Sequence, residues 1–185
     1  MTEEETTDTG KVNVLFVCLG NICRSPMAEA VFRHIAEKDP PHPLIDFVDS
    51  AGTAAYHTGS NPDPRTTATL DVNGIDDYEH AARQVSESDF EDFQYILGMD
   101  RENVSNLKFI RARLVHRRDG DETGLAHVGL FGDYGGKKNK RGQGEEVEDP
   151  YYGGDNGFKK CYEQMNRFSI AFLQMLEQEK AEGRL

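Results

Sequence analysis

Residues 14–31, VLFVCLGNICRSPMAEAV, decide how this chain folds and where its chemistry lies. The apolar, β-branched run at 12–17 is typical of a buried parallel strand. Ser25 suits the N-cap of a helix, and Pro26 suits its first turn. The sequence therefore predicts a strand, a tight loop and a helix in succession, with Cys18 at the carboxyl end of the strand.

The rest of the chain alternates between strand-like and helix-like segments. We expect further strands at 44–48, 93–98 and 108–116, and helices at 64–72, 86–90, 155–182 and, as a short helix, from Asp100 onward. This alternation predicts an α/β fold, a three-layer α/β/α arrangement with a central four-stranded parallel sheet and right-handed crossovers. Ligands of such sheets bind beyond the carboxyl ends of the strands, where Cys18 lies.

Length and charge limit the organisation and the partners of the chain. Its 185 residues favour a single domain at 11–185, preceded by an acidic tail at 1–10 that we expect to be disordered. A long polar loop is predicted at about 117–148. A formal net charge of −12 argues against binding to nucleic acid or to an anionic membrane. The basic run at 135–142 is interpreted as a solvated loop because glutamates follow it at once.

The cysteines indicate the compartment. Three cysteines is an odd count without the spacing of a disulfide framework, which favours free thiols in a reducing compartment and hence a cytoplasmic location. The N-terminal segment lacks the features of a signal peptide, and no stretch is long and apolar enough to cross a bilayer. The six histidines are scattered, so no metal site is predicted.

The loop after the first strand combines a nucleophile with an anion site. Arg24 follows Cys18 by six residues, and Gly20 and Asn21 between them tolerate unusual backbone angles. Successive N–H groups can then point inward as a nest at the N-terminus of a helix, where they suit a phosphate group. The same positive field is expected to stabilise a Cys18 thiolate, which is the form that attacks. The predicted chemistry is phosphoryl transfer to sulfur.

These residues carry a resemblance to a known family. Residues 14–31 resemble the signature of the low-molecular-weight protein tyrosine phosphatases, and residues 149–153, DPYYG, resemble that family's second signature. Segments between them also resemble the family in its order, at 49–53, 62–65, 80–85 and 98–100. The resemblance spans about 12–176 and departs from the family in the long polar stretch before Asp149.

The resemblance implies a mechanism without metal or cofactor. Cys18 is the expected nucleophile, Arg24 the phosphate clamp, and Asp149 the general acid and then base, in hydrolysis through a phosphocysteine intermediate. The implied substrates are phosphotyrosine proteins and small aryl phosphates. Inorganic phosphate and vanadate are the implied inhibitors.

The resemblance also assigns supporting roles. Backbone N–H groups that bind phosphate are expected from Leu19, Gly20, Asn21, Ile22, Cys23 and Arg24, with the Ser25 hydroxyl bonded to the sulfur. Asn21, Ser25 and His80 are expected to support the loop, and Ile22, Tyr56, Tyr151 and Tyr152 to line the substrate pocket. Cys18 and Cys23 are the expected redox pair, and Cys161 is interpreted as core.

Some alternatives stay open. Asp100 suits either the loop scaffold or a plain helix N-cap, and Tyr56 suits either the pocket wall or a packed surface position. A protein arginine phosphatase shares the loop, although that subgroup usually has threonine where this chain has Ile22. A thiol-dependent arsenate reductase would need a cysteine relay, for which only Cys23 and Cys161 remain. A phosphate-binding module without activity is the non-enzyme alternative.

Overall fold

A four-stranded, all-parallel sheet organises the molecule in a computed structural model that describes residues 10–185, apart from the side chain of Asp155. The strands are β1 (Val12–Cys18), β2 (Ile45–Gly52), β3 (Tyr95–Gly98) and β4 (His127–Leu130), in the order β2-β1-β3-β4. The predicted parallel sheet is confirmed. Most of the predicted tail, residues 1–9, lies outside the described residues.

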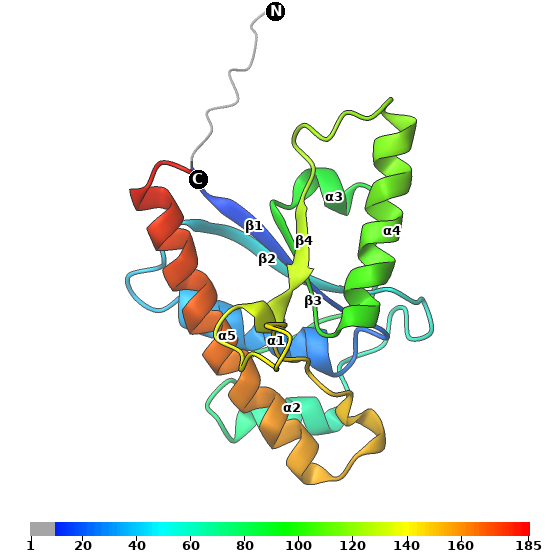
Figure 1. Cartoon of the computed structure of the whole chain (residues 1–185). Helices are drawn as coiled ribbons and strands as arrows, with labels where there is room; N and C mark the ends of the chain where they lie inside the picture. Colours follow the sequence, from blue (N-terminus) through cyan, green and yellow to red (C-terminus); the bar gives the residue numbers. More distant parts are fainter. Residues whose placement is uncertain (1–9) are drawn as a thin grey trace, which may run out of the picture.

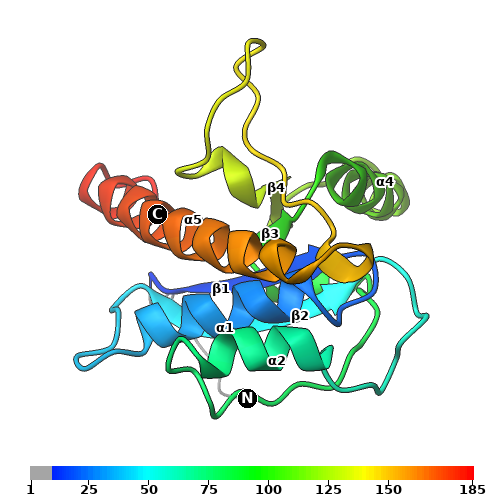
Figure 2. The ribbon, with the colours of Figure 1, turned by 90° about the horizontal axis from the view of Figure 1, so that it is seen from below.

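Helices cover both faces of the sheet. They are α1 (Arg24–Ala36), α2 (Pro64–Asp71), α3 (Asp89–Asp92), α4 (Arg101–Arg117) and α5 (Asp155–Ala181), with short 3₁₀ turns at η1 (Phe131–Asp133) and η2 (Pro150–Tyr152). Figures 1 and 2 show α1, α2 and α5 on one side and α3 and α4 on the other. The predicted three layers are therefore present. None of the described helices combines the length and apolar character that a membrane span requires.

The central strand β1 is apolar from Val14 to Cys18 because both of its faces are buried there. Val14 and Phe16 face the core beneath α1 and α5, whereas Leu15 and Val17 face the core beneath α4. The Phe16 ring packs 4.8 Å, centroid to centroid, from that of Phe131. Burial of one such ring contributes roughly 1.5–3 kcal/mol, so this packing fixes the strand that delivers Cys18.

The predicted strand at 108–116 is wrong, because these residues form the second half of α4. The helix begins at Asp100, whose side chain accepts from the Asn103 N–H at 2.7 Å in a capping box, and it continues to Arg117. Only Leu107 and Leu114 among its apolar side chains are fully buried, seven residues apart on one face. A helix with so narrow an apolar stripe resembles a polar edge strand in sequence.

The true fourth strand lies in the predicted polar loop at 117–148. β4 has only four residues, HVGL, too few to show a β-branched run or a clear alternation. Its register with β3 pairs Tyr95 with His127 and Gly98 with Leu130. The loop prediction is thus corrected to a strand, a 3₁₀ turn and an excursion that returns to Asp149.

That excursion is tied to the body of the protein at its base. The Glu145 N–H donates to the Gly132 carbonyl at 3.1 Å, an approach so close that a Cβ at Gly132 would lie 1.7 Å from the Glu145 carbonyl oxygen. The Glu145 carboxylate accepts from Arg167 at 2.9 Å and from Gln164 at 2.8 Å. The Arg167 guanidinium lowers the pKa of Glu145 to about 2. Glu145 therefore anchors the return segment as a charged group at neutral pH.

Candidate active site

Cys18 lies where β1 ends, at the bottom of a cavity of about 210 Å³ beside the N-terminus of α1. Arg24 and Asp149 line the same cavity, so the structure brings the three predicted catalytic residues together. His57 lines it too and was missed from the sequence, where nothing distinguished it within a polar loop. The helix begins at Arg24 with Cys23 at its N-cap, so the expectation of Ser25 as N-cap is wrong.

Ser25 faces the nucleophile instead of capping the helix. Its hydroxyl lies 3.1 Å from the Cys18 sulfur, and the Asn21 N–H donates to that sulfur at 3.3 Å. Both contacts can stabilise a negative sulfur, because hydrogen bonds to the charged form of a group favour that form. Cys18 is buried except for 3% of its surface. The thiol is therefore reached only through the cavity.

The Arg24 guanidinium is fixed at the wall of the cavity. Nη1 donates to the Asp100 carboxylate at 2.6 Å and to the Val147 carbonyl at 3.0 Å. Nη2 lies 3.5 Å from the Asp149 carboxylate. Burial opposes the charge, but Cys18 and the hydrogen bond to Asp100 outweigh it and raise the pKa of Arg24. A permanent, oriented cation thus stands beside the sulfur.

Asp100 has both of the roles that the sequence left open. One carboxylate oxygen caps α4 through the Asn103 N–H at 2.7 Å, and the other accepts from Arg24. A single side chain therefore connects the start of α4 to the guanidinium. Asp100 can do this because it lies two residues after the end of β3 at Gly98, at the carboxyl edge of the sheet.

Asn21 holds the loop in an uncommon backbone conformation. Its φ is 56°, in the left-handed region, and its side chain is almost fully buried. The side-chain oxygen accepts from His80 at 2.8 Å and from the Arg83 N–H at 2.9 Å. The side-chain NH₂ group donates to Ser25 at 2.9 Å and to Ser50 at 3.0 Å. All four hydrogen-bonding positions of the amide are used, which offsets the cost of the turn.

Gly52, at the end of the neighbouring strand, lets a second segment support the loop. The Thr53 N–H donates to the Cys18 carbonyl at 2.8 Å, and the Ala54 N–H donates to the Leu19 carbonyl at 3.0 Å. A Cβ on Gly52 would lie 2.7 Å from the Leu19 carbonyl oxygen. Any other residue would push the two segments apart.

The similarity to known proteins covers the part of the chain that forms this fold and cavity. Residues 13–182 match the family described as low molecular weight phosphotyrosine protein phosphatase. The chain is 46% identical over 168 residues to the phosphatase of that name from Schizosaccharomyces pombe, covering 91% of this chain and 99% of that protein. It is 41% identical over 162 residues to the human phosphatase of the same name, covering 88% and 94%. This chain belongs to the low molecular weight phosphotyrosine protein phosphatase family.

Solved structures agree with this assignment. A protein tyrosine phosphatase from Entamoeba histolytica, crystallised with Hepes in its active site, superimposes with a TM-score of 0.74 at 32% identity, over 92% of this chain and 99% of that one. An arginine phosphatase from Drosophila superimposes with a TM-score of 0.75 at 36% identity, over 88% and 96%. The family fold is thus shared by enzymes named for different phosphorylated residues.

In this phosphatase-family chain, a buried polar network lies behind Asn21. Glu29 accepts from Ser50 at 2.7 Å and from Tyr78 at 2.8 Å, and burial raises the pKa of Glu29 to about 7. His80 faces Glu29 across 3.4 Å, and burial lowers the pKa of His80. Sequence reasoning found His80 but missed Glu29. The sequence did contain a signal for Glu29, because this carboxylate lies four residues after Ser25 and therefore on the same face of the helix, toward the core.

Three of these side chains approach each other closely enough to suggest a metal site. Potential ligand atoms of Glu29, Asp49 and His80 all lie within 4.8 Å of one another. Protein donors already occupy them, because Glu29 binds Ser50 and Tyr78, and Asp49 accepts from Arg83 at 2.9 Å. The cluster is therefore accounted for as support for the loop.

The other two cysteines, Cys23 and Cys161, are both buried. Cys23 is buried at the N-cap of α1, and burial together with the nearby Asp63 raises the pKa of Cys23 to about 12. Cys161 is buried among the apolar residues packed around α5, as predicted, and burial also raises its pKa. Both of these cysteines therefore stay protonated at neutral pH.

Aromatic side chains form the rim of the cavity. Tyr151 and Tyr152 pack edge to face with centroids 4.9 Å apart, and the Tyr151 N–H donates to Asp149 at 3.1 Å. Arg65 stacks over Tyr151 at 5.4 Å from the ring centroid. Tyr56 lines the cavity with 77% of its surface exposed, which argues against the alternative of a packed surface tyrosine. Ile22 is half-buried in the same wall.

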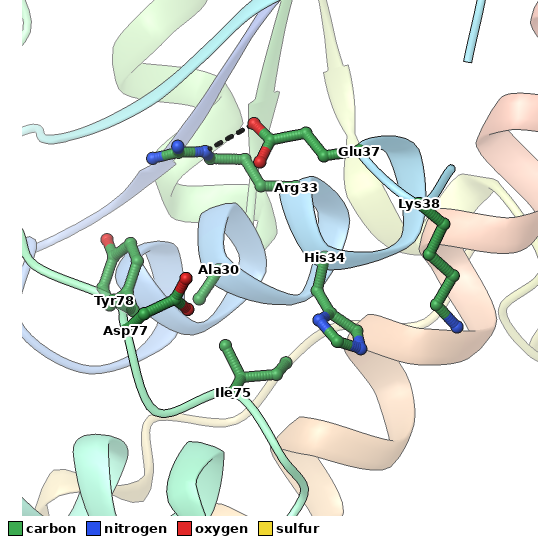
Figure 3. Close-up of a pocket in the computed structure, with 8 residues that line it drawn as sticks. All are labelled: Ala30, Arg33, His34, Glu37, Lys38, Ile75, Asp77 and Tyr78. Atoms are coloured by element: carbon green, nitrogen blue, oxygen red, sulfur yellow. Dashed lines mark hydrogen bonds and ion pairs between the residues drawn. The ribbon is translucent and has the colours of Figure 1, made fainter. Parts of the chain in front are cut away.

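A larger cavity, of about 340 Å³, lies between α1 and residues 75–78, away from Cys18 (Figure 3). Its wall carries the Arg33–Glu37 ion pair, with 3.0 Å between Nε and the carboxylate, and the Tyr78 ring. No cysteine lines it. The three predicted catalytic residues line only the smaller of these two cavities.

Replacing Asn21 separates backbone strain from hydrogen bonding. We expect Asn21→Ala and Asn21→Gly each to lower the free energy of unfolding by about 3 kcal/mol or more, because both leave buried partners unsatisfied. Alanine should cost about 1 kcal/mol more than glycine, since only glycine adopts φ of 56° freely. Urea denaturation measures both values. Wild-type stability in Asn21→Gly would show that the side-chain bonds do not hold the loop.

Proposed function

We propose that this chain is a protein tyrosine phosphatase that hydrolyses phosphotyrosine and other aryl phosphates through a phosphocysteine intermediate. The observation that carries the proposal is that Cys18, Arg24 and Asp149 line one cavity, with Nη2 of Arg24 3.5 Å from the Asp149 carboxylate. The proteins most similar in sequence that are described above carry this activity in their names. The family therefore supports the reaction class, and the cavity supports the residue roles.

Binding uses groups that are already oriented. In this proposal the backbone N–H groups of residues 19–24 and the Arg24 guanidinium bind the oxygens of the phosphate, as donors at the N-terminus of a helix do. Asp100 and Val147 hold Nη1 of Arg24. Nη2 has only the long 3.5 Å contact with Asp149, so it is the nitrogen that can turn to a phosphate oxygen.

In the first step the Cys18 thiolate attacks phosphorus and the bond to the tyrosyl oxygen breaks. The leaving group is a phenolate whose conjugate acid has a pKa of about 10, so it benefits from a proton. Asp149 donates that proton from the mouth of the cavity, where 36% of its side chain is exposed. The products of this step are the free phenol, ionised Asp149 and an S-phosphorylated Cys18.

In the second step water releases the phosphoryl group. Ionised Asp149 accepts a proton from the water as it attacks phosphorus, and the sulfur–phosphorus bond breaks. The departing sulfur is again an anion, which the Ser25 hydroxyl and the Asn21 N–H stabilise. Inorganic phosphate leaves and Asp149 is once more protonated.

Phosphotyrosine is favoured over the alternative substrates by the walls of the cavity. Tyr56, Tyr151 and Ile22 offer apolar contacts to an aryl ring. The similarity to a Drosophila arginine phosphatase keeps phosphoarginine as a second candidate substrate. An arsenate reductase relay is disfavoured, because Cys161 is fully buried with a raised pKa and cannot serve as an exposed thiolate.

Several further roles belong to the same proposal. When a peroxide oxidises the Cys18 thiolate to a sulfenic acid, the Cys23 thiol attacks that sulfur and water leaves, which gives a reducible Cys18–Cys23 disulfide. The raised pKa of Cys23 makes this attack slow. Inorganic phosphate and vanadate inhibit by occupying the phosphate position. The enzyme works without metal or cofactor, does not bind nucleic acid or membranes, and is cytoplasmic.

A substrate panel tests the proposal directly. We expect phosphotyrosine peptides to be hydrolysed with the highest kcat/KM, phosphoarginine peptides less well and phosphoserine peptides hardly at all, with orthovanadate inhibiting each reaction. The matched control is Cys18→Ser, which should lose turnover by at least 10³-fold (an order-of-magnitude expectation for removal of a nucleophile) yet still bind phosphate. Preferred turnover of phosphoarginine would change the substrate assignment, and substantial turnover by Cys18→Ser would remove sulfur from the mechanism.

The role of Asp149 is tested by varying the leaving group. We expect Asp149→Ala to slow phosphotyrosine cleavage by about 10²-fold or more, because a poor leaving group then departs without a proton. An aryl phosphate whose phenol is strongly acidic should lose far less. Glu148→Ala removes the neighbouring exposed carboxylate, which pairs with Lys160, and should change neither rate. Equal losses on both substrates would contradict the general-acid assignment.

A further inference from the structure

The excursion before Asp149 carries a concentrated positive charge on an otherwise acidic protein. We call residues 135–144 the basic arm. Four exposed cations, Lys137, Lys138, Lys140 and Arg141, occupy five consecutive positions, although the whole chain has 21 Lys and Arg against 33 Asp and Glu. Figure 2 shows the arm projecting from the body beyond β4. A cationic tip held away from an acidic surface is accessible to an anionic partner.

The glutamates that flank the arm pair with the body of the protein. Their ion pairs are Glu145 with Arg167, Glu146 with Arg101, and Glu148 with Lys160, whereas Asp133 pairs with Lys138 of the arm itself. Within residues 10–185, no ion pair involves Lys137, Lys140 or Arg141. The solvated-loop interpretation relied on neutralisation by the neighbouring glutamates, and those glutamates pair with the body of the protein instead.

The tip of the arm is organised by its own hydrogen bonds. The Asn139 side-chain oxygen accepts from the Arg141 N–H at 2.9 Å and from the Gln143 N–H at 3.0 Å. The Asn139 N–H donates to the Gln143 carbonyl at 3.0 Å, which closes the turn. A closed turn presents its cations with less loss of conformational entropy on binding than a random coil would.

The arm is connected directly to the catalytic cavity. Its return segment passes through Val147, whose N–H donates to the Met99 carbonyl at 2.9 Å and whose carbonyl accepts from Arg24. Asp149 follows Arg141 by eight positions, so at roughly 3.4 Å per residue the two Cα atoms are at most about 27 Å apart. A partner engaged at the cavity is therefore within reach of the arm.

We propose that the basic arm docks an acidic segment of the phosphoprotein substrate while its phosphotyrosine occupies the Cys18 cavity. The proposal rests on the phosphatase function above. A short acidic peptide touches the cationic tip alone, whereas a long polyanion such as nucleic acid would also meet the acidic body of a protein with net charge −12. Because the reach from arm to cavity is an upper bound, the acidic residues lie at most about eight positions from the phosphotyrosine in an extended peptide.

Matched peptides test this directly. One peptide carries phosphotyrosine with four glutamates placed within eight residues of it, and its partner has glutamines at those positions. The arm variant combines Lys137→Gln, Lys140→Gln and Arg141→Gln. The control variant makes the same charge change at exposed lysines outside the arm, with Lys11→Gln, Lys38→Gln and Lys108→Gln.

At low ionic strength, we expect the glutamate peptide to exceed the glutamine peptide about tenfold in kcat/KM for the wild type and the control variant. The arm variant should show a ratio near one, and added salt should lower the wild-type ratio toward one. Turnover of p-nitrophenyl phosphate should be the same in all three proteins. A wild-type ratio near one, or a ratio unchanged in the arm variant, overturns the proposal.

Two further measurements separate the alternatives. The first is the binding of a duplex oligonucleotide. The proposal fails, and the arm is a nucleic-acid contact, if the wild type binds the duplex with strong salt dependence, the arm variant does not bind it, and the wild-type ratio of the two peptides is one. If none of the three proteins hydrolyses p-nitrophenyl phosphate, the proposed phosphatase function fails instead. Fluorescence anisotropy of the unphosphorylated peptides then still decides whether the arm binds the acidic segment.

Discussion

The buried Asn21 side chain is the constraint on which the rest of the site depends. Asn21 has a left-handed backbone conformation, which costs free energy for residues other than glycine. Four hydrogen bonds of its side chain offset this cost, and their partners are His80, Arg83, Ser25 and Ser50. This turn aims the Asn21 N–H at the Cys18 sulfur. It also brings β2, through Ser50, against the loop that leaves β1. The loop that holds Cys18, the proposed nucleophile, is thus positioned by polar contacts that reach Asn21 from up to 62 residues away.

The groups on the two sides of this turn differ in charge. Arg24 supplies a permanent cation at the sulfur, and Asp100 and the Val147 carbonyl fix its orientation. Behind the loop, burial disfavours the charged forms of Glu29 and His80, so that region contributes hydrogen bonds more than net charge. In the proposed function the cavity binds phosphate through this local geometry, although the protein has a net charge of −12. The basic arm adds cations outside the cavity without disturbing this arrangement.

The sequence predicts the centre of the molecule better than its edge. The segment from β1 to α1 was predictable because a buried central strand is apolar throughout, and a loop that must hold an anion needs residues such as Gly20 and Asn21. β4 was missed because four residues at a sheet edge carry no periodicity, and the second half of α4 was misread because its apolar stripe is narrow. Glu29 and the second role of Asp100 depend on contacts across 21 and 76 residues, which no local pattern contains.

The central claim is that phosphorus is transferred to the Cys18 sulfur. Rapid quenching of the wild-type enzyme during turnover of a ³²P-labelled phosphotyrosine peptide, followed by proteolysis and sequencing of the labelled fragment, tests it most directly. The account predicts label on Cys18 within the first turnover, and none on Cys23 or Cys161. Release of labelled phosphate with no label on Cys18 at any time during that turnover would contradict it.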